Sequence, residues 1–247
     1  MSDESIAAGV QQICSRGFAI LRGQLPIALV DDCRAGFRAH WESFIGHNPP
    51  PNRGPHRYFL AMPFELPCFS PRFFVDPDIL RLVRAVMDDR VVADQWGCDV
   101  PLFGSEHQRM HADYARPLFG EAPDRVLPPF ALVVSFGLAA IASEDGPIEI
   151  APGTHLLPRP RAAAAVEAGY IRLEPVPLAV GDVLIRNPWT LHRGTPNTTR
   201  TPRFLASIRY VRRWYADDSR EVRAVPGSLW ESLPTECRQV MRFPVDV

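Results

Sequence analysis

The segment MHADYARP, residues 110–117, places an imidazole, His111, and a carboxylate, Asp113, two positions apart. Successive side chains of a strand point to opposite faces, so if HQRMHADY (residues 107–114) is a strand, both groups lie on the same face. An imidazole and a carboxylate that converge on one point could hold a metal ion. So short a pattern also occurs by chance, and a third ligand must decide between a metal site and a core histidine.

His192 is the candidate third ligand. It lies in TLHRGTPN, directly after GDVLIRNP, whose residues predict a strand followed by a turn. Two imidazoles and one carboxylate on one face of a metal leave its opposite face open, the arrangement that non-haem Fe(II) oxygenases use. Zinc hydrolases also use mixed histidine and carboxylate ligands, so the three residues alone do not name the metal.

An arginine follows the third ligand along the chain. Arg203 opens RFLASIRYVRRWY (residues 203–215), which predicts a strand, and we expect this strand to run antiparallel beside the one that carries His192. A guanidinium near an open Fe(II) site is a rigid fork for a dicarboxylate whose other end chelates the metal, a description that fits 2-oxoglutarate. Arg200 is the rival for this role.

Helices and short strands must position these groups. Apolar residues at three- and four-residue intervals predict helices over residues 5–15, 27–44 and 78–87, and residues 159–169 and 228–240 predict two further helices. FAILRG alternates like a strand, whereas the proline-rich residues 47–71 predict a long ordered loop. Runs rich in valine, isoleucine and aromatic residues predict the strands of a sandwich or barrel at 91–100, 107–114, 130–138, 147–153, 171–178, 181–186 and 203–215.

Four segments together resemble a known family: HADYARP, GPIEIAPGTH, AVGDVLIRNPWTLHRGTPN and the TPR that follows. As an ordered set they are similar to the phytanoyl-CoA dioxygenase (PhyH-like) family of Fe(II)/2-oxoglutarate-dependent oxygenases, with matches from about Phe18 to Tyr210. The resemblance implies a mainly β fold with flanking helices and a double-stranded β-helix (jelly roll, cupin-like) core. We expect one domain, 1–247, with helical N-terminal support at 1–90, the jelly-roll core at about 91–215 and a C-terminal tail at 216–247.

The resemblance also assigns roles to single residues. It implies that the catalytic iron ligands are His111, Asp113 and His192. It makes Arg203 the residue that binds the distal carboxylate of 2-oxoglutarate. The residue two after the distal histidine, often a small hydroxyl in this family, is Gly194 here, so Thr195 is the candidate helper for that carboxylate. Gln95 is either a polar residue of the pocket or an ordinary surface glutamine.

The implied reaction uses Fe(II), O2 and 2-oxoglutarate to oxidise a small organic molecule. Hydroxylation of an unactivated C–H bond with release of succinate and CO2 is the default outcome, and desaturation or ring formation stays open. Related halogenases replace the carboxylate ligand with a small residue, so Asp113 disfavours halogenation. Two other classes also stay open: a zinc-dependent hydrolase with the same three ligands, and a non-catalytic jelly-roll binding protein.

Two further segments carry histidines or arginines. NRGPHRYFLAMPF (residues 52–64) could fold over the open end of the barrel, so that Arg57 or His56 contacts a polar or anionic group of the substrate. The alternative is that the arginines of this loop are solvated and its aromatic residues anchor it. His155 in GPIEIAPGTH is assigned to a turn between sheets rather than to the metal.

Composition excludes several kinds of partner. The net charge of −1 and the pI near 6.7 provide no basic surface for nucleic acid or an anionic membrane, so we expect a small-molecule substrate and leave the oligomeric state open. The 27 basic residues are all arginine, which excludes a Schiff-base lysine. The 5 cysteines form no CxxC pair, and neither an export signal nor a long apolar run is present, so we expect a cytoplasmic protein.

Overall fold

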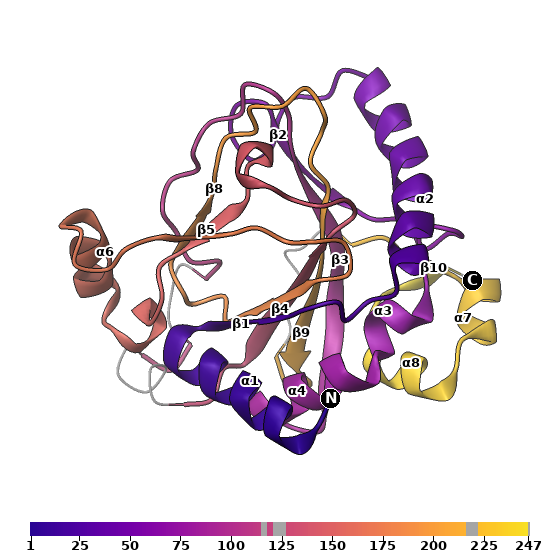
Figure 1. Cartoon of the computed structure of the whole chain (residues 1–247). Coiled ribbons are helices and arrows are strands. Elements are labelled where there is room, and N and C mark those ends of the chain that lie inside the picture. The colour runs from indigo at the N-terminus through magenta and orange to yellow at the C-terminus, as the bar shows by residue number, and fades with distance from the viewer. Residues whose placement is uncertain (115–117, 121–126, 216–221, 247) are drawn as a thin grey trace.

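The computed structural model describes residues 1–114, 118–120, 127–215 and 222–246. A six-stranded antiparallel sheet forms its centre (Figure 1). In order across the sheet, the strands are β1 (Phe18–Leu21), β7 (Val183–Arg186), β4 (Ala131–Gly137), β9 (Leu205–Arg212), β3 (Val91–Pro101) and β2 (Arg57–Ala61). Chain order and sheet order differ strongly, so segments distant in sequence become neighbours in this sheet.

Two smaller sheets complete the strands of the described residues. A three-stranded antiparallel sheet has the order β6 (Glu174–Val176), β5 (Ile148–Ile150) and β8 (His192–Gly194). A parallel pair joins β10 (Val225–Pro226) to β11 (Val245–Asp246) near the C-terminus. The three-stranded sheet carries His192 and is therefore the element that matters most for the site.

The helices flank the large sheet. They are α1 (Asp3–Arg16), α2 (Ile27–Gly46), α3 (Pro71–Val75), α4 (Pro77–Val86), α6 (Arg159–Glu167), α7 (Gly227–Ser232) and α8 (Thr235–Val240), with short 3-10 turns at η1 (Ser143–Asp145) and η2 (Thr154–Leu156). Figure 1 shows α6 apart from the other helices, on the side of the three-stranded sheet. Among the described residues, no helix is both long and apolar enough to cross a bilayer.

Local signals explain where two of these helices begin and end. Ser2 caps α1 by accepting a hydrogen bond from the Ser5 backbone amide, and Gly17 ends the helix in the left-handed region at φ 87°. The side chain of Asp76 accepts hydrogen bonds from the amides that open α4. Capping of this kind satisfies amides that have no partner within the helix.

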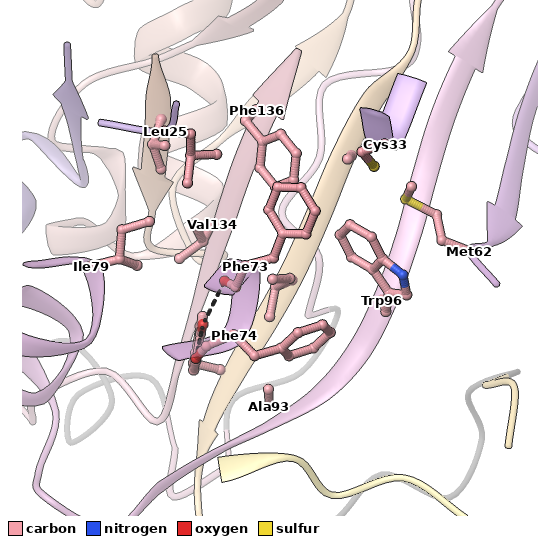
Figure 2. Packing of buried hydrophobic residues seen from close by; sticks show 14 of the residues in the cluster. Leu25, Cys33, Met62, Phe73, Phe74, Ile79, Ala93, Trp96, Val134 and Phe136 are labelled. Carbon is pink, nitrogen blue, oxygen red and sulfur yellow. Dashed lines mark hydrogen bonds between the residues drawn. The ribbon is translucent and has the colours of Figure 1, made fainter. Parts of the chain in front are cut away.

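The two faces of the large sheet differ in chemistry. Alternate residues such as Trp96, Phe136 and Ile208 pack against the helices in the main apolar core (Figure 2). The residues between them in sequence point to the other face, where buried polar side chains gather: Gln95, Ser135, Arg186, Ser207 and Arg209. A second apolar cluster joins the two sheets, with Leu184 and Leu205 from the large sheet and Ile150 from the small one. One face of the large sheet therefore packs the main apolar core, and the other face points toward the three-stranded sheet.

Most predicted elements are confirmed. The three N-terminal helices, the strand between the first two and the strands at 91–100, 130–138, 147–153, 171–178, 181–186 and 203–215 all have counterparts. The result is a mixed fold of helices and antiparallel sheets.

Three predictions about elements are wrong. HQRMHADY is not a strand but an irregular segment that forms an isolated β-bridge with β8 at His111, and the Gln108 amide also donates to the Gly194 carbonyl at 3.0 Å. The proline-rich loop at 47–71 contains β2, so residues 1–90 supply both edge strands of the large sheet as well as helices. The predicted closing helix is divided into α7 and α8 at Leu233, which is extended before Pro234. Residues 115–117, the end of HADYARP, lie outside the described residues.

Truncation of Phe73 tests the core. This α3 side chain is 1% exposed and its ring stacks on those of Trp96, at 5.7 Å, and Phe136, at 5.0 Å. We expect Phe73→Ala to lower the free energy of unfolding by about 3–5 kcal/mol, measured by urea denaturation of the metal-free protein. The control is Tyr170→Ala, at a residue that is 88% exposed, which should change this free energy by less than about 0.5 kcal/mol. Equal effects of the two substitutions would contradict the packing described here.

Candidate metal centre

In the part of the chain that the structure describes, one group of three side chains is arranged to hold a metal ion: His111, Asp113 and His192. Their ligand atoms all lie within 4.8 Å of one another. Asp113 Oδ1 is 3.9 Å from His111 Nε2 and 3.4 Å from His192 Nε2. Three residues predicted from sequence spacing therefore converge on one point.

Backbone hydrogen bonds bring the ligands together. His111 and His192 exchange both of their backbone hydrogen bonds, at 3.0 and 2.9 Å, and the Asp113 amide donates to the Pro188 carbonyl at 3.0 Å. His192 lies in β8, whereas the segment with the other two ligands has no regular structure. An isolated β-bridge thus positions the two histidines, whereas the sequence predicted a whole strand there.

The Nδ1 atom of each imidazole lies beside a backbone carbonyl oxygen. His111 Nδ1 lies 2.8 Å from the Arg109 carbonyl oxygen, and His192 Nδ1 lies 2.9 Å from the Thr190 carbonyl oxygen. Arg186 Nη1 also lies 3.3 Å from His192 Nδ1. A carbonyl oxygen only accepts, so a proton on Nδ1 donates to it and leaves Nε2 to bind a metal. This is the form in which histidine binds a metal through Nε2, with its other nitrogen held by the surrounding protein. The donor set therefore fits a divalent cation such as iron.

Arg186, at the end of β7, contacts the site and was missed by the sequence analysis. Its Nη2 donates to Asp113 Oδ2 at 2.9 Å, and its side chain is 7% exposed. The contact occupies one carboxylate oxygen and leaves Oδ1 facing the imidazoles. The sequence contains a signal for this residue, because Arg186 is the only charged side chain in VLIR, an otherwise apolar strand.

Electrostatics keep the ligands in the protonation states that metal binding needs. Burial by itself would raise the pKa of Asp113, but Arg186 and the two imidazoles hold it well below its usual range. Burial, followed by the charge of Arg186, lowers the pKa of His192, although Asp113 opposes the shift. At neutral pH the carboxylate is ionised and the imidazole is neutral, as metal ligands must be.

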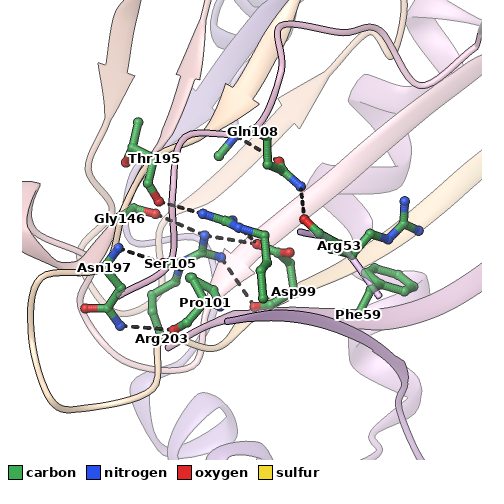
Figure 3. A network of polar contacts seen from close by, with 12 residues as sticks. Arg53, Phe59, Asp99, Pro101, Ser105, Gln108, Gly146, Thr195, Asn197 and Arg203 are labelled. Carbon is green, nitrogen blue, oxygen red and sulfur yellow. Dashed lines mark hydrogen bonds and ion pairs between the residues drawn. The ribbon is translucent and has the colours of Figure 1, made fainter. Parts of the chain in front are cut away.

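Arg203 lies at the base of the space between the sheets. Its Nη2 is 3.0 Å from Asp99 Oδ2 and donates to the Gly146 carbonyl at 3.0 Å, and its side chain is 3% exposed (Figure 3). Asn197 holds the turn that leads to it, since its Nδ2 donates to the carbonyls of Pro101 and Thr201 at 3.0 and 2.8 Å. Arg200, the alternative to Arg203, is exposed. Its Cζ lies 5.3 Å from the centroid of the Phe103 ring, and Phe103 is 53% exposed.

The expected position of the Arg203 strand is wrong. β9, which begins two residues after Arg203, lies between β4 and β3 in the large sheet, whereas β8 pairs with β5 in the small one. Consecutive strands here belong to different sheets, so the arginine approaches the site from the facing sheet rather than from a neighbouring strand.

The remaining predicted residues have mixed environments. Gln95 is 9% exposed on β3, so the surface interpretation is wrong, and its role in the pocket stays a prediction. The Thr195 hydroxyl donates to the Pro147 carbonyl at 2.6 Å, and the Thr195 carbonyl accepts from Arg57 Nη2 at 2.6 Å. The helper role of Thr195 also stays a prediction.

Two residues of the predicted lid differ from each other. Arg57 is 1% exposed within β2, so the interpretation of Arg57 as a solvated arginine is wrong. His56 is exposed in the turn before this strand. Contact of either residue with substrate stays a prediction. His155 Nε2 lies 3.1 Å from the Cys14 carbonyl oxygen, and His155 is not part of the ligand group, as expected.

Comparisons with known proteins agree with this site. A family model described as Phytanoyl-CoA dioxygenase (PhyH) matches residues 13–205. Among solved structures, AviO1 from Streptomyces viridochromogenes Tue57 has a TM-score of 0.67 at 19% identity, with 88% of this chain and 99% of that chain covered. The non-heme alpha ketoglutarate dependent carbocyclase SnoK from nogalamycin biosynthesis has a TM-score of 0.62 at 17% identity, with 85% and 84% covered. The epimerase SnoN in complex with Fe3+, alpha ketoglutarate and nogalamycin RO gives 0.62 at 17% identity, with 100% and 96% covered. At such identities these structures establish a shared fold.

Removal of any one ligand tests the metal centre. We expect His111→Ala, Asp113→Ala and His192→Ala each to lose the weak visible absorption band that anaerobic Fe(II) and 2-oxoglutarate produce with the wild type, because each substitution removes one of the three ligands. Far-ultraviolet circular dichroism checks that the fold is retained. The matched control is His107→Ala, at an exposed histidine of the same segment, which should keep the band. A normal band in the His192 variant would contradict the assignment.

Proposed function

The chain belongs to the phytanoyl-CoA dioxygenase family, and we propose that it hydroxylates an unactivated C–H bond of a small organic molecule with release of succinate and CO2. It is an Fe/2-oxoglutarate-dependent dioxygenase, with iron and 2-oxoglutarate as its cofactors. Neither a zinc hydrolase nor a binding protein without activity agrees with this membership.

We further propose that the core is a double-stranded β-helix within one domain of residues 1–247. The three-stranded sheet faces the polar side of the large sheet, and the apolar cluster of Leu184, Leu205 and Ile150 closes the space between them. The core at about 91–215 receives edge strands from the first 90 residues. The tail from 216 contributes α7 and α8 among its described residues.

The residues of this site have distinct tasks in the proposed reaction. His111, Asp113 and His192 hold the iron, and Arg203 binds the distal carboxylate of 2-oxoglutarate. The iron, when bound with 2-oxoglutarate, supplies the oxidation of the substrate by O2. Arg186 orients the Asp113 carboxylate, and the two backbone carbonyls behind the imidazoles hold their rings.

One observation carries the proposal: three possible ligands converge, and the buried Arg203 shares Asp99 with Arg57, whose guanidinium donates to the Thr195 carbonyl three residues after His192. Arg203 is 3% exposed and is ion-paired with Asp99 at 3.0 Å, and a guanidinium is a fork that suits a carboxylate.

The substrate is best sought by a screen. A panel of small organic molecules is tested for substrate-stimulated release of succinate, and each product is then examined by mass spectrometry. Hydroxylation adds about sixteen daltons, whereas desaturation or ring formation removes about two. SnoK is named as a carbocyclase and SnoN as an epimerase, so products of unchanged mass are also examined by chiral chromatography. Succinate release that no candidate stimulates above the substrate-free rate would leave the hydroxylase proposal without support, and a stimulated reaction with a product other than an alcohol would overturn it.

Substitution of Arg203 tests the co-substrate site. We expect Arg203→Ala to weaken 2-oxoglutarate binding by about 2–4 kcal/mol, or roughly 30- to 1000-fold, because it removes charge-assisted hydrogen bonds to a shielded carboxylate. Anaerobic titration of the Fe(II) protein measures this affinity, and iron should still bind. Arg200→Ala is the control and should leave the affinity unchanged. The opposite result for the two variants would transfer the role to Arg200.

A further inference from the structure

Two buried arginines share a single carboxylate in the space between the sheets. Arg57 Nη1 lies 2.9 Å from Asp99 Oδ2, and Arg203 Nη2 lies 3.0 Å from the same oxygen. The two arginine side chains are 1% and 3% exposed. Figure 3 shows the network around them, in which Asp99 lies beside Arg203. We call Arg57 and Arg203 the arginine pair.

The arginine pair carries more positive charge than Asp99 neutralises. Two guanidiniums face one carboxylate, and their other described hydrogen bonds go to the neutral carbonyls of Thr195, Gly146 and Asp99. Among the described residues no second carboxylate forms an ion pair with the arginine pair, so one buried positive charge lacks a counterion there. Uncompensated buried charge is costly, so a ligand with one negative charge is strongly favoured there.

The arginine pair also has unused donors. The Nε atoms of Arg57 and Arg203 are both buried and have no hydrogen-bond partner in the part of the chain that the structure describes. Buried donors without partners are uncommon in folded proteins. A carboxylate that binds beside the pair could accept hydrogen bonds from these groups as well as supply the missing charge.

Gly194 shows where Arg57 lies relative to the metal centre. A Cβ atom added at Gly194 would be 2.2 Å from Arg57 Nη1 and 2.6 Å from its Cζ, so the guanidinium lies against the backbone of β8. The φ of Gly194 is not in the left-handed region, so this glycine is needed for space and not for backbone conformation. It is two residues after His192, about 7 Å along a strand. Arg57 therefore lies close to the ligand-bearing strand.

We propose that Arg57 binds the distal carboxylate of 2-oxoglutarate together with Arg203, and that Asp99 holds the two guanidiniums so that the pair accepts one monoanionic group. The proposal rests on the proposed function. It assigns Arg57 to the co-substrate instead of the prime substrate, and it explains Gly194 as the position that must lack a side chain to admit the second guanidinium. The pair then selects keto acids that carry a distal carboxylate.

Two keto acids separate a binding role of Arg57 from a structural one. The Fe(II) protein is titrated anaerobically with 2-oxoglutarate and with pyruvate, which has the same chelating end but no distal carboxylate. We expect Arg57→Ala to weaken 2-oxoglutarate binding roughly 10- to 100-fold and to leave pyruvate binding within about twofold of wild type. Arg57→Lys, which keeps the charge but not the fork, should recover part of the loss.

Gly194→Ala provides a second variant that does not change any arginine. Its Cβ should displace the Arg57 guanidinium and reproduce the selective loss for 2-oxoglutarate. In the Arg57→Ala background the same substitution should have little further effect, because the two changes act through one contact. The matched control is Arg53→Ala, at an exposed arginine of the same segment whose guanidinium lies over the ring of Phe59, and it should bind both keto acids normally.

Each outcome of these titrations decides the proposal. An equal loss for both keto acids in the Arg57 variants would make Arg57 a structural residue, and unchanged 2-oxoglutarate binding would remove it from this site. If wild type itself gives no band with 2-oxoglutarate, the proposed function is wrong and this proposal falls with it.

Discussion

The metal centre depends on one exchange of backbone hydrogen bonds. His111 and His192 each donate their amide to the other's carbonyl, and this pairing fixes an irregular segment to the strand β8. Backbone pairing sets the distance between two strands at roughly 5 Å, so side chains on the same face of such a pair must meet. Asp113 then needs only its own amide bond to Pro188 to arrive beside both imidazoles.

Arginines that meet carboxylates set the charge of the interior. Arg186 binds the Asp113 carboxylate, and the arginine pair binds Asp99. The first contact satisfies one oxygen of a ligand and leaves the other for a cation, whereas the second leaves positive charge for an anion. The group of His111, Asp113 and His192 is therefore suited to a cation and the arginine pair to an anion, the two sites that a chelating co-substrate with a distal carboxylate would use under the proposal above.

The two faces of the large sheet differ, since one packs the main apolar core and the other carries buried polar side chains. One face packs Trp96 and Phe136 against Phe73 of α3 in an aromatic core. Side chains alternate along a strand, so the residues on either side of an apolar core residue point to the opposite face, which carries the polar side chains. Polar groups such as Gln95 and Arg209 are buried on the other face. Removing such groups from water is unfavourable unless they are hydrogen-bonded.

Sequence alone determined the chemistry and the local elements. The types and spacing of the ligands, the arginine after the distal histidine, and the helices at 5–15, 27–44 and 78–87 depend on local periodicity and on residue type, which can be read along the chain. Tertiary structure alone decided which strands are neighbours. It placed β2 inside a proline-rich segment and put β8 and β9 in different sheets, and it brought Arg186 to Asp113 and Arg57 to Asp99. Pairing between distant segments depends on the packing of the whole chain. Backbone N–H and C=O groups are the same at nearly every residue, so they do not by themselves specify which strands pair.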